Sequence, residues 1–347
     1  MNIVVLTTLC FIFTAIGTGL LIIILKRGNI MDIPNERSSH VSSIPRGGGI
    51  VVLSALICFW LVDRYLSQQW IAGELFILII AALLGIVCFV DDLRGLSPYL
   101  KLLFQIIGVA ASLIIVNDRG AIFQAWLPIW IDLTLTGLMW LWFINLFNFM
   151  DGIDGITAVQ MISIGLGLSL LSVFGLLNSW VFIPAMLIVA CALGFLIWNW
   201  APAKVFMGDV GSVPLGYLIG WLLISVVIPS NSFGIELLTI VLLPAYYYAD
   251  ATITIIRRFL CKKNIFQAHR EHFYQFAVDR GLSHGQVCGA IILANLILFG
   301  AVLLCIEFNI SVSITIGLAI VTLLLFWMRG VFSVSYTHLT LPTTPYV

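Results

Sequence analysis

Long apolar stretches alternate with short polar connectors along almost the whole chain. A helix needs about 20 apolar residues to cross the hydrocarbon core of a bilayer, and most of these stretches are near that length. We therefore predict eleven membrane-spanning helices, over residues 3–25, 48–62, 72–90, 100–116, 124–144, 158–177, 180–198, 213–229, 236–256, 286–306 and 309–327.

The composition strengthens this interpretation. Hydrophobic residues make up 61% of the 347 residues and charged residues only 9%, with a mean hydropathy of +1.13. The chain thus has too little polar surface to cover a soluble globule, and we predict an all-α, polytopic integral membrane helix bundle. The seven cysteines show no CxxC spacing and are expected to be core residues. The first stretch lacks the basic start and cleavage site of a signal peptide, so we interpret it as a retained span.

Basic residues gather on one side of the predicted bundle. When the spans are numbered alternately, fourteen of the 16 lysines and arginines fall on one side, and only Arg64 and Arg119 fall on the other. Cytoplasmic loops carry such an excess, so the N-terminus is predicted outside and the longer polar loops in the cytoplasm. A miscount of one span would reverse this orientation. The inner loops cover residues 26–47, 91–99, 145–157, 199–212 and 257–285.

No internal repeat or separate soluble domain interrupts this pattern, and we predict one multi-span domain over residues 1–333. Residues 334–347 differ because they are polar, contain two prolines and show no helical period. We interpret residues 334–347 as a non-native or disordered tail and exclude them from the functional argument.

Six aspartates lie at or just inside the ends of the apolar stretches, all on the predicted inner side. A carboxylate near hydrocarbon is costly unless it is paired or bound to a metal ion. A one-sided cluster of acids therefore predicts a functional site that contains a cation. The six are Asp91, Asp92, Asp151, Asp154, Asp209 and Asp250.

The motif FVDDLRGL, residues 89–96, ends the third predicted span. Its adjacent acids, Asp91 and Asp92, cannot both relax in a low dielectric without a cation or a shared proton, which suits a general base or a metal ligand. The alternative is a solvated helix end with a turn at Arg94 and Gly95.

The motif NFMDGIDG follows the fifth predicted span. Asn148, Asp151 and Asp154 recur every third residue, so one helical turn would aim them in the same direction. Each Asp-Gly step is also a natural tight turn, and a plain loop is the alternative.

The motif FMGDVGS opens the eighth predicted span and places Asp209 between two glycines. Glycines permit close approach of the backbone to a phosphate, and the amides of a helix N-terminus attract the anion. As an alternative, Asp209 is a simple helix N-cap.

Basic and histidine residues in two other inner loops provide positive charge on the same predicted side. Guanidinium groups suit bidentate phosphate binding, while a solvated connector is the alternative for each loop. In FQAHREHFYQ the two histidines would share one face of a helical turn, without forming the HExxH zinc signature. These residues are Arg37, His40, Arg46, His269, Arg270 and His272.

Two further features of the inner side have competing interpretations. Asp250 lies about 10 Å inside the membrane from Arg257 at the 1.5 Å rise of a helix. It either pairs with Arg257 or Lys204 or supports a metal site. The GLSHG segment matches the G-x-S-x-G pattern, but Ser283 with Gln286 is better explained as a capping box.

Taken in order, DIPNERSSH with PRGGG, FVDDLRGL, NFMDGIDG, FMGDVGS and AHREH resemble the polyprenyl-phosphate N-acetylhexosamine-1-phosphate transferases, the MraY and WecA superfamily of glycosyl transferase family 4. The resemblance runs from Asp32 to about Arg280. The eleven spans are similar to WecA-type members, and the PNERSSH and AHREH forms are most similar to the WbpL and WbcO branch, which starts O-antigen and capsule chains. The adjacent histidines of the MraY loop are absent.

The resemblance implies transfer of a sugar 1-phosphate from a UDP-N-acetylhexosamine to undecaprenyl phosphate, with release of UMP. It implies an enzyme of the bacterial cytoplasmic (inner) membrane with Mg²⁺ as cofactor, Mn²⁺ being the alternative. The expected partners are the lipid, the UDP-amino sugar and the bilayer, with no nucleic acid and with a homodimer left open. The sugar, of GlcNAc, QuiNAc or FucNAc type, stays undetermined.

The resemblance also implies roles for individual residues. Asp209 and Asp151 are expected to bind the metal, and Asp91, Asp92, Asp151 and Asp154 to be catalytic. A multi-span transporter with an acidic ion site is the alternative, but transporters place charges near the midplane and in repeated halves. The expected substrate-binding residues are Arg37, His40, Arg46, Asn148, Lys204, His269, Arg270 and His272.

Overall fold

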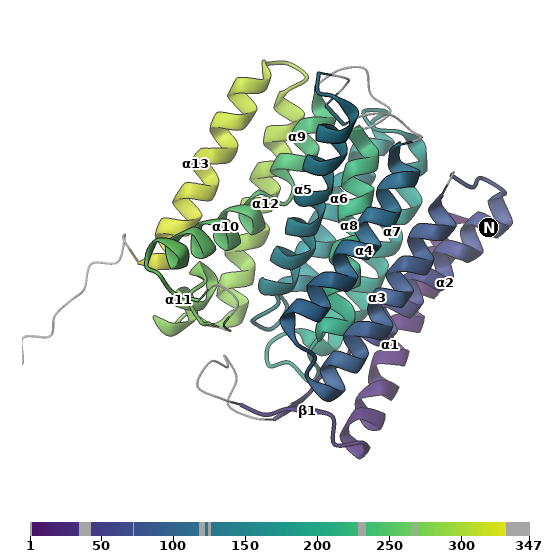
Figure 1. Ribbon diagram of the computed structural model, residues 1–347, viewed down its shortest axis with the longest axis vertical. Coiled ribbons are helices and arrows are strands. Elements are labelled where there is room, and N and C mark those ends of the chain that lie inside the picture. The colour runs from purple at the N-terminus through teal and green to yellow at the C-terminus, as the bar shows by residue number, and fades with distance from the viewer. Residues whose placement is uncertain are drawn as a thin grey trace, which may run out of the picture.

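The computed structural model describes residues 2–34, 43–71, 73–117, 122–123, 126–227, 234–264, 267 and 269–330. Within these ranges the chain forms thirteen α-helices, one short 3₁₀ helix and one antiparallel pair of two-residue strands (Figure 1). The elements are α1 (Ile3–Arg27), β1 (Met31–Asp32), β2 (Ile44–Pro45), α2 (Gly49–Ser67), α3 (Glu74–Arg94), α4 (Pro98–Asn117), α5 (Ile129–Phe149), α6 (Ile156–Val173), η1 (Ser179–Val181), α7 (Phe182–Asn199), α8 (Asp209–Val227), α9 (Ile235–Leu242), α10 (Ala245–Leu260), α11 (Phe273–Asp279), α12 (His284–Leu304) and α13 (Ile310–Arg329).

The predicted all-α membrane bundle is confirmed. Among the described residues, ten helices are long and apolar enough to cross a membrane, and the bent pair α9 and α10 would make an eleventh span. The capping box predicted at Ser283 and Gln286 is present at the start of α12. Of the seven cysteines, four are buried, but Cys58 and Cys261 are exposed on the bundle surface, contrary to the prediction for them.

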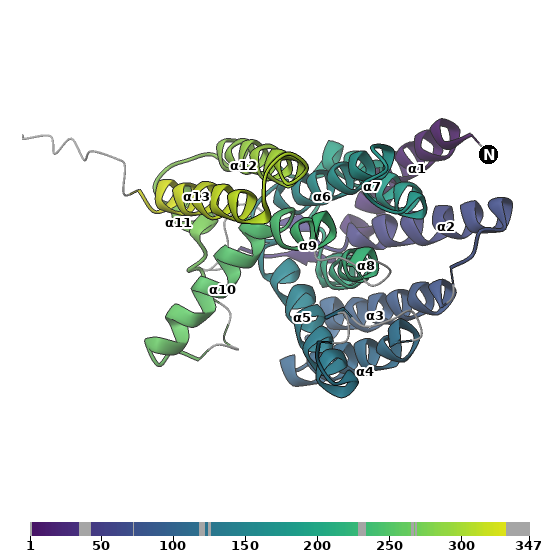
Figure 2. The same ribbon diagram turned by 90° about the horizontal axis from the view of Figure 1, so that it is seen from above.

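Helix α8 is the centre of the bundle. It is buried along its whole length and packs against α2, α3, α5 and α9 (Figure 2). A helix that is apolar on all sides is either enclosed by other helices or spans a membrane. Helix α8 is enclosed, whereas most residues of the apolar α1 and α13 are not buried within the bundle. The first residue of α8 is Asp209, so the most enclosed helix carries this acid to one end of the bundle.

The stretch predicted as one span over residues 236–256 is broken instead into α9 and α10, which meet at an angle of 53°. Pro244 has no N–H to donate, and the Leu243 carbonyl accepts a hydrogen bond from Gln160 Nε2 at 3.2 Å. Asn295 Nδ2 donates to Gln160 Oε1 at 2.9 Å. Buried amide side chains on α6 and α12 therefore stabilise the break, and α10 leans away from the bundle (Figure 2).

Close backbone contact joins the start of α2 to the start of α8. The Gly49 N–H donates to the Met207 carbonyl at 2.8 Å. A Cβ atom on Gly49 would lie 2.2 Å from Gly211 Cα, so the two helices approach at a distance that requires glycine. This contact places Arg46, just before α2, beside the first turn of α8.

At the other end of α2 and α3 lies a buried charged cluster that the sequence analysis did not identify. Arg64 donates through Nε to both carboxylate oxygens of Glu74, at 3.0 and 2.9 Å, and through Nη1 to Asp63 at 3.1 Å. Trp60 also donates to Glu74, at 2.7 Å. Glu74 is fully buried, so its charge depends on these donors.

Replacing Gly49 by alanine should destabilise the protein by about 1–3 kcal/mol, because the added methyl group must push α2 away from α8. Thermal unfolding of the purified protein in detergent measures this loss. Gly289→Ala is the control, since nothing lies within 4 Å of a Cβ atom there. Equal unfolding midpoints for the two variants would contradict the close helix contact.

Replacing Arg64 by methionine should cost about 3–5 kcal/mol, because Glu74 keeps its buried charge without its main partner. The double variant Arg64→Met with Glu74→Leu should recover part of that loss, since both charges are gone. Thermal midpoints of the single and double variants check this. A double variant less stable than the single one would show that the ion pair is not the stabilising feature.

Candidate active site

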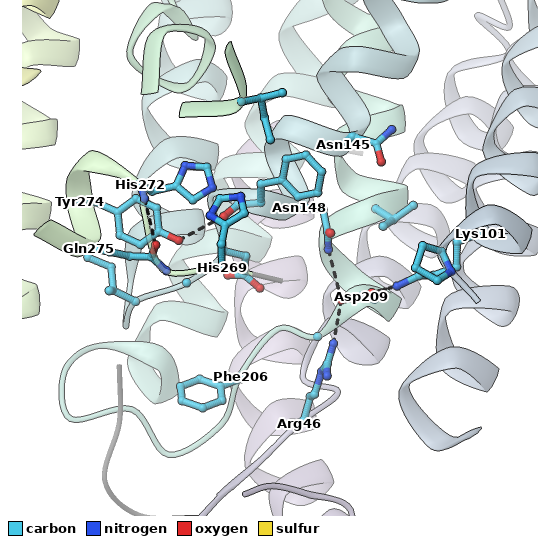
Figure 3. Close-up of a pocket in the computed structure, with 18 of the residues that line it drawn as sticks. Arg46, Lys101, Asn145, Asn148, Phe206, Asp209, His269, His272, Tyr274 and Gln275 are labelled. Carbon is cyan, nitrogen blue, oxygen red and sulfur yellow. Dashed lines mark hydrogen bonds and ion pairs between the residues drawn. The ribbon is translucent and has the colours of Figure 1, made fainter. Parts of the chain in front are cut away.

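A cavity of about 880 Å³ lies among the ends of α4, α5, α8 and α10 and the first residues of α12 (Figure 3). Its wall is mixed, with charged and amide side chains on one part and aliphatic and aromatic side chains on another. The polar side chains that the sequence analysis singled out and that line this cavity are Arg46, Asn148, Asp151, Asp154, Asp209, His269 and His272.

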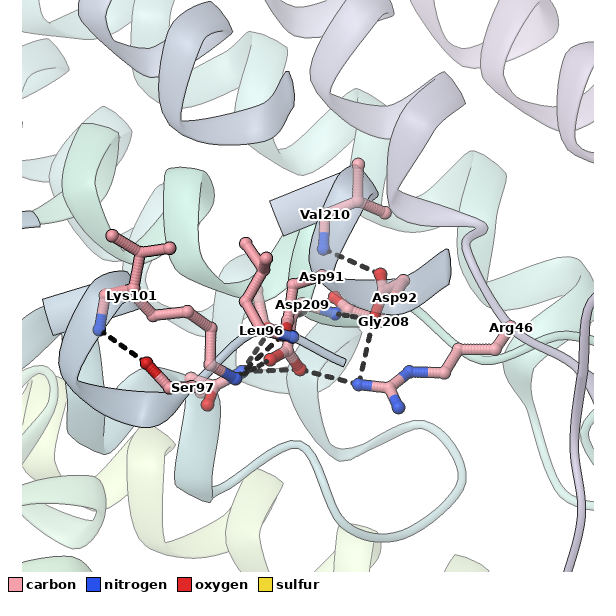
Figure 4. Close-up of polar contacts among 12 residues, drawn as sticks. Arg46, Asp91, Asp92, Leu96, Ser97, Lys101, Gly208, Asp209 and Val210 are labelled. Atoms are coloured by element: carbon pink, nitrogen blue, oxygen red, sulfur yellow. Dashed lines mark hydrogen bonds and ion pairs between the residues drawn. The ribbon is translucent and has the colours of Figure 1, made fainter. Parts of the chain in front are cut away.

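Three carboxylates meet beside this cavity. Asp91 and Asp92, at the end of α3, and Asp209, at the start of α8, place ligand atoms within 4.8 Å of one another. Arg46 Nη2 lies 2.9 Å from Asp92 Oδ1 and 2.7 Å from Asp209 Oδ1. Lys101 Nζ lies 2.8 Å from both Asp91 Oδ2 and Asp209 Oδ2 (Figure 4). Three negative charges are thus held by two positive ones. We call these five residues the carboxylate centre.

The two adjacent aspartates also accept hydrogen bonds from backbone N–H groups around the centre. Asp92 accepts hydrogen bonds from the N–H groups of Asp209 and Val210, at 3.3 and 3.1 Å, so it caps the start of α8. Asp91 Oδ1 accepts from the Leu96 N–H at 2.6 Å in the turn after α3. A turn follows α3, as the helix-end interpretation of FVDDLRGL supposed, but Asp91 is buried and not solvated, and both acids contribute charge to the centre. Asp209 is not the cap of α8 but its first residue, positioned by Asp92.

Two described residues from the segment between α1 and α2 line the cavity, Asp32 and Arg46. Arg37 and His40 lie outside the described residues, and their roles stay predictions. Burial alone would lower the pKa of Arg46, but the charges of Asp209 and Asp92 more than offset this and raise it. The guanidinium therefore remains positive beside the acids.

The predicted helical turn through NFMDGIDG is wrong. Helix α5 ends at Phe149, so Asn148 is helical while Asp151 and Asp154 lie in the following loop. The two Asp-Gly steps explain this, because they favour turns over helix. All three polar side chains nevertheless line the cavity, and Asn148 Nδ2 donates to Asp209 Oδ1 at 3.2 Å.

The two loop aspartates have different surroundings. Burial raises the pKa of Asp151 to about 6, although a hydrogen bond from Thr157 opposes the shift. Asp154 Oδ2 accepts from the Ala203 N–H at 3.0 Å and lies 3.2 Å from His284 Nδ1. Asp151 does not belong to the group of three close carboxylates, so the geometry does not support the expected metal-binding role for it.

The histidine loop is not a helical turn either. His272 is the N-cap of α11, and residues 269–271 before it are not helical. The rings of His269 and His272 still stack, with centroids 5.0 Å apart, and Tyr274 stacks on His272 at 5.5 Å. Burial and the neighbouring His272 lower the pKa of His269 to about 4, so this ring is neutral at neutral pH. Arg270 instead pairs with Asp279 at 2.6 Å and does not line the cavity.

The predicted pairing of Asp250 with Arg257 or Lys204 is wrong, and the geometry does not support the substrate-binding role expected for Lys204. Asp250 is fully buried and accepts hydrogen bonds from the segment around His272, and in the described part of the chain it pairs with neither Arg257 nor Lys204. Lys204 does not line the cavity, and its Nζ lies 5.2 Å from the centroid of the Trp198 ring. The exposed loop position of Lys204 allows its ammonium group to point away from the acids.

Several cavity residues were not identified from the sequence, and five of them show why. Lys101 and Gln105 lie one helical turn apart at the polar start of an apolar stretch, a spacing that could have indicated a shared face. Asn199 Oδ1 accepts from the N–H of the residue after Asp154, at 3.0 Å, and so ties two loops together. No local pattern marks the other residues. The five are Lys101, Gln105, Asn199, Phe206 and His284.

The sequence also matches a family model and several known proteins. The model of glycosyl transferase family 4 matches residues 74–227, which include α3, α5, α8 and the acids of the centre. A relative from Bacillus subtilis (strain 168), described as a probable undecaprenyl-phosphate N-acetylglucosaminyl 1-phosphate transferase, is 30% identical over 274 residues. That alignment covers 73% of this chain and 71% of the relative.

Two other relatives align with this chain over 322 and 197 residues. A decaprenyl-phosphate N-acetylglucosaminephosphotransferase from Mycobacterium leprae (strain TN) is 27% identical over 322 residues, covering 84% of this chain and 80% of the relative. A phospho-N-acetylmuramoyl-pentapeptide-transferase from Streptococcus sanguinis (strain SK36) is 30% identical over 197 residues, covering 52% of this chain and 58% of the relative. With the extent of the Bacillus match, these similarities show that the chain belongs to glycosyl transferase family 4, the MraY and WecA superfamily.

Proposed function

We propose that this protein transfers an N-acetylhexosamine 1-phosphate from a UDP-sugar to undecaprenyl phosphate and releases UMP. The observation that carries the proposal is the carboxylate centre, in which three acids and two cations meet beside a cavity large enough for a nucleotide sugar. The names of the Bacillus and Mycobacterium relatives, which describe transfer to polyprenyl phosphates, support the same chemistry.

The donor atoms of the centre suit a divalent cation. Mg²⁺ and Mn²⁺ prefer oxygen ligands, and Asp91, Asp92 and Asp209 offer carboxylate oxygens close enough to share one ion. The excess negative charge left by Arg46 and Lys101 favours binding of such an ion. Bound there, the metal would neutralise charge on the transferring phosphoryl group.

Two anionic substrates must approach each other in this reaction. An oxygen of the lipid phosphate forms a bond to the β-phosphorus of the UDP-sugar, and the bond from that phosphorus to the oxygen bridging to the α-phosphate breaks. The bonding electrons leave with UMP. Arg46, Lys101 and His272 would hold phosphate oxygens during transfer, and Asp92 would accept a proton from the lipid phosphate.

The mixed wall of the cavity fits one soluble and one lipid substrate. Its apolar part comes from α4, α5, α8 and α10, next to the outward-leaning α10, where a prenyl chain in the bilayer could reach the centre. Carboxylate and amide side chains line the rest of the cavity, which suits the nucleotide. The apolar lining residues are Leu102, Leu138, Leu141, Trp142, Val213 and Ile255.

The finer assignment follows from the motifs named in the sequence analysis. We propose that the enzyme lies in the bacterial cytoplasmic membrane with its centre on the inner face, and that it belongs to the WbpL and WbcO branch, which starts O-antigen and capsule chains. UDP-GlcNAc, UDP-QuiNAc and UDP-FucNAc are the donors to compare. GlcNAc has the support of two relatives by name.

Asp209→Asn should reduce UMP release from UDP-GlcNAc and undecaprenyl phosphate by at least about 100-fold, because the amide removes one of three metal-binding charges. Purified protein in detergent with added Mg²⁺ provides the assay, and a chelator should abolish activity in the wild type. Asp279→Asn is the control, since Asp279 lies outside the cavity and, in the part of the chain that the structure describes, forms an ion pair with Arg270 alone. Full activity of Asp209→Asn would remove the proposed metal role.

Two lysines allow a matched test of the geometry. Lys101→Met should lower UMP release about tenfold or more, since it removes a cation that contacts two acids of the centre. Lys204→Met should leave activity within about twofold, because Lys204 lies outside the cavity. The same assay measures both variants. A larger loss for Lys204→Met than for Lys101→Met would show that the cavity described above is not the reaction site.

A further inference from the structure

A fully buried carboxylate on α10 lies next to the histidine loop without belonging to the carboxylate centre. Asp250 Oδ1 lies 3.0 Å from His272 Nδ1 and accepts from the Phe273 N–H at 3.0 Å. Asp250 Oδ2 accepts from the Tyr274 N–H at 3.2 Å and from the Tyr246 hydroxyl at 3.0 Å. The Asp250 carboxylate thus accepts several hydrogen bonds, most of them from residues 272–274.

The hydrogen bonds define which nitrogen of His272 carries the proton at this contact. Asp250 Oδ1 already accepts from a backbone N–H, so the carboxylate acts there as an acceptor. The ring nitrogen that faces it therefore acts as the donor, which places a proton on Nδ1. The Gln275 N–H also approaches the His272 side chain, but it donates to the His272 carbonyl at 3.1 Å. Since His272 lines the cavity, its second nitrogen, Nε2, is the one left to meet a substrate.

We infer that Asp250 is a positioning residue that holds His272 with Nδ1 protonated, so that Nε2 is presented to a phosphate group in the cavity. This inference rests on the proposed function, in which His272 binds substrate phosphate. When Nε2 takes a proton, the ring becomes a cation that donates to a phosphate oxygen, and the buried carboxylate behind it stabilises that charge.

Among the described residues, few other groups near His272 could determine which ring nitrogen is protonated. From α10, Tyr246 and Asp250 face it, and from its own segment His269 and Tyr274 stack on it. Burial, with the charges of Asp250 and Asp151, raises the pKa of Tyr274, so that phenol stays neutral. His269 is neutral as well, which leaves Asp250 as the charged group in hydrogen-bond contact with His272.

A separate contact anchors the same loop, so the role of Asp250 can be distinguished from simple attachment. Glu271 binds Arg258 and accepts from Lys263 Nζ at 3.0 Å, and its carbonyl accepts from Arg257. These bonds fasten the loop to the end of α10 next to Asp250. Loss of the Asp250 charge therefore leaves one attachment of the segment intact.

A double-mutant cycle tests the inference through kinetics. Asp250→Asn should lower kcat for UMP release at least about tenfold, with KM for the UDP-sugar within about threefold, because the amide lacks the charge and one acceptor of the carboxylate. In the background of His272→Gln, adding Asp250→Asn should lower kcat by less than about threefold, since the two residues act as a unit. Losses that multiply, or an unchanged kcat for Asp250→Asn, would overturn the inference.

The control variant is Thr254→Val, which removes a distant hydroxyl contact to Asp250 at 3.4 Å but keeps the carboxylate. It should leave kcat within about twofold. A tenfold loss in Thr254→Val would show that any disturbance of this part of α10 has the same effect, and would overturn a specific role of the charge.

A measurement on the His272 ring of the wild type tests the inference even where Asp250→Asn fails to fold or the proposed reaction is not observed. In protein with ¹⁵N-labelled histidine, the signal that disappears in His272→Gln identifies His272. Its chemical shifts should show Nδ1 protonated and Nε2 as the titrating nitrogen. A neutral ring protonated at Nε2 would overturn the inference, whereas absence of UMP release from every donor tested would overturn only the proposed function.

Discussion

An imbalance of charge at the ends of four helices is the constraint on which the rest of the structure depends. Asp91, Asp92 and Asp209 lie within contact distance of one another, and among the described residues Arg46 and Lys101 are the cations that pair with them. Like charges in a low dielectric repel strongly, so this arrangement persists only because the helices are held rigidly behind it. The glycine contact between α2 and α8 and the burial of α8 provide that rigidity. A centre prepared in this way can bind a cation and phosphates with little rearrangement.

Much of the fold and part of the site could be predicted because a membrane restricts the choices. Each apolar stretch had to become a helix, and acids at the inner ends of successive spans had to fall at one end of the bundle. This is why the approach of Asp91, Asp92 and Asp209 follows from their positions alone. It also explains why the break at Pro244 was missed, since the apolar stretch continues through it. The Leu243 carbonyl accepts a hydrogen bond from Gln160, which Asn295 holds in place, and both residues are far away in sequence.

Side-chain direction in loops could not be predicted in the same way. Lys204 and Lys101 both belong to the predicted inner side, yet only Lys101 contacts the acids, because a residue in the first turns of a helix has a fixed direction and a residue in an exposed loop does not. The partner of Asp250 could not be predicted either. Its depth in α10 indicated a buried partner, but the partner is the N-cap of α11, His272, which no periodicity relates to α10.

The most direct test of the central claim is binding of a divalent ion to the purified protein, followed by electron paramagnetic resonance of Mn²⁺. We expect one Mn²⁺ to bind per chain, to be displaced by Mg²⁺, and to change its spectrum when a UDP-sugar is added. Substituting Asp209 should abolish this binding, while substituting the distant Asp279 should not. Binding that persists without the Asp209 carboxylate would contradict the account, because the three acids would then have another reason to meet.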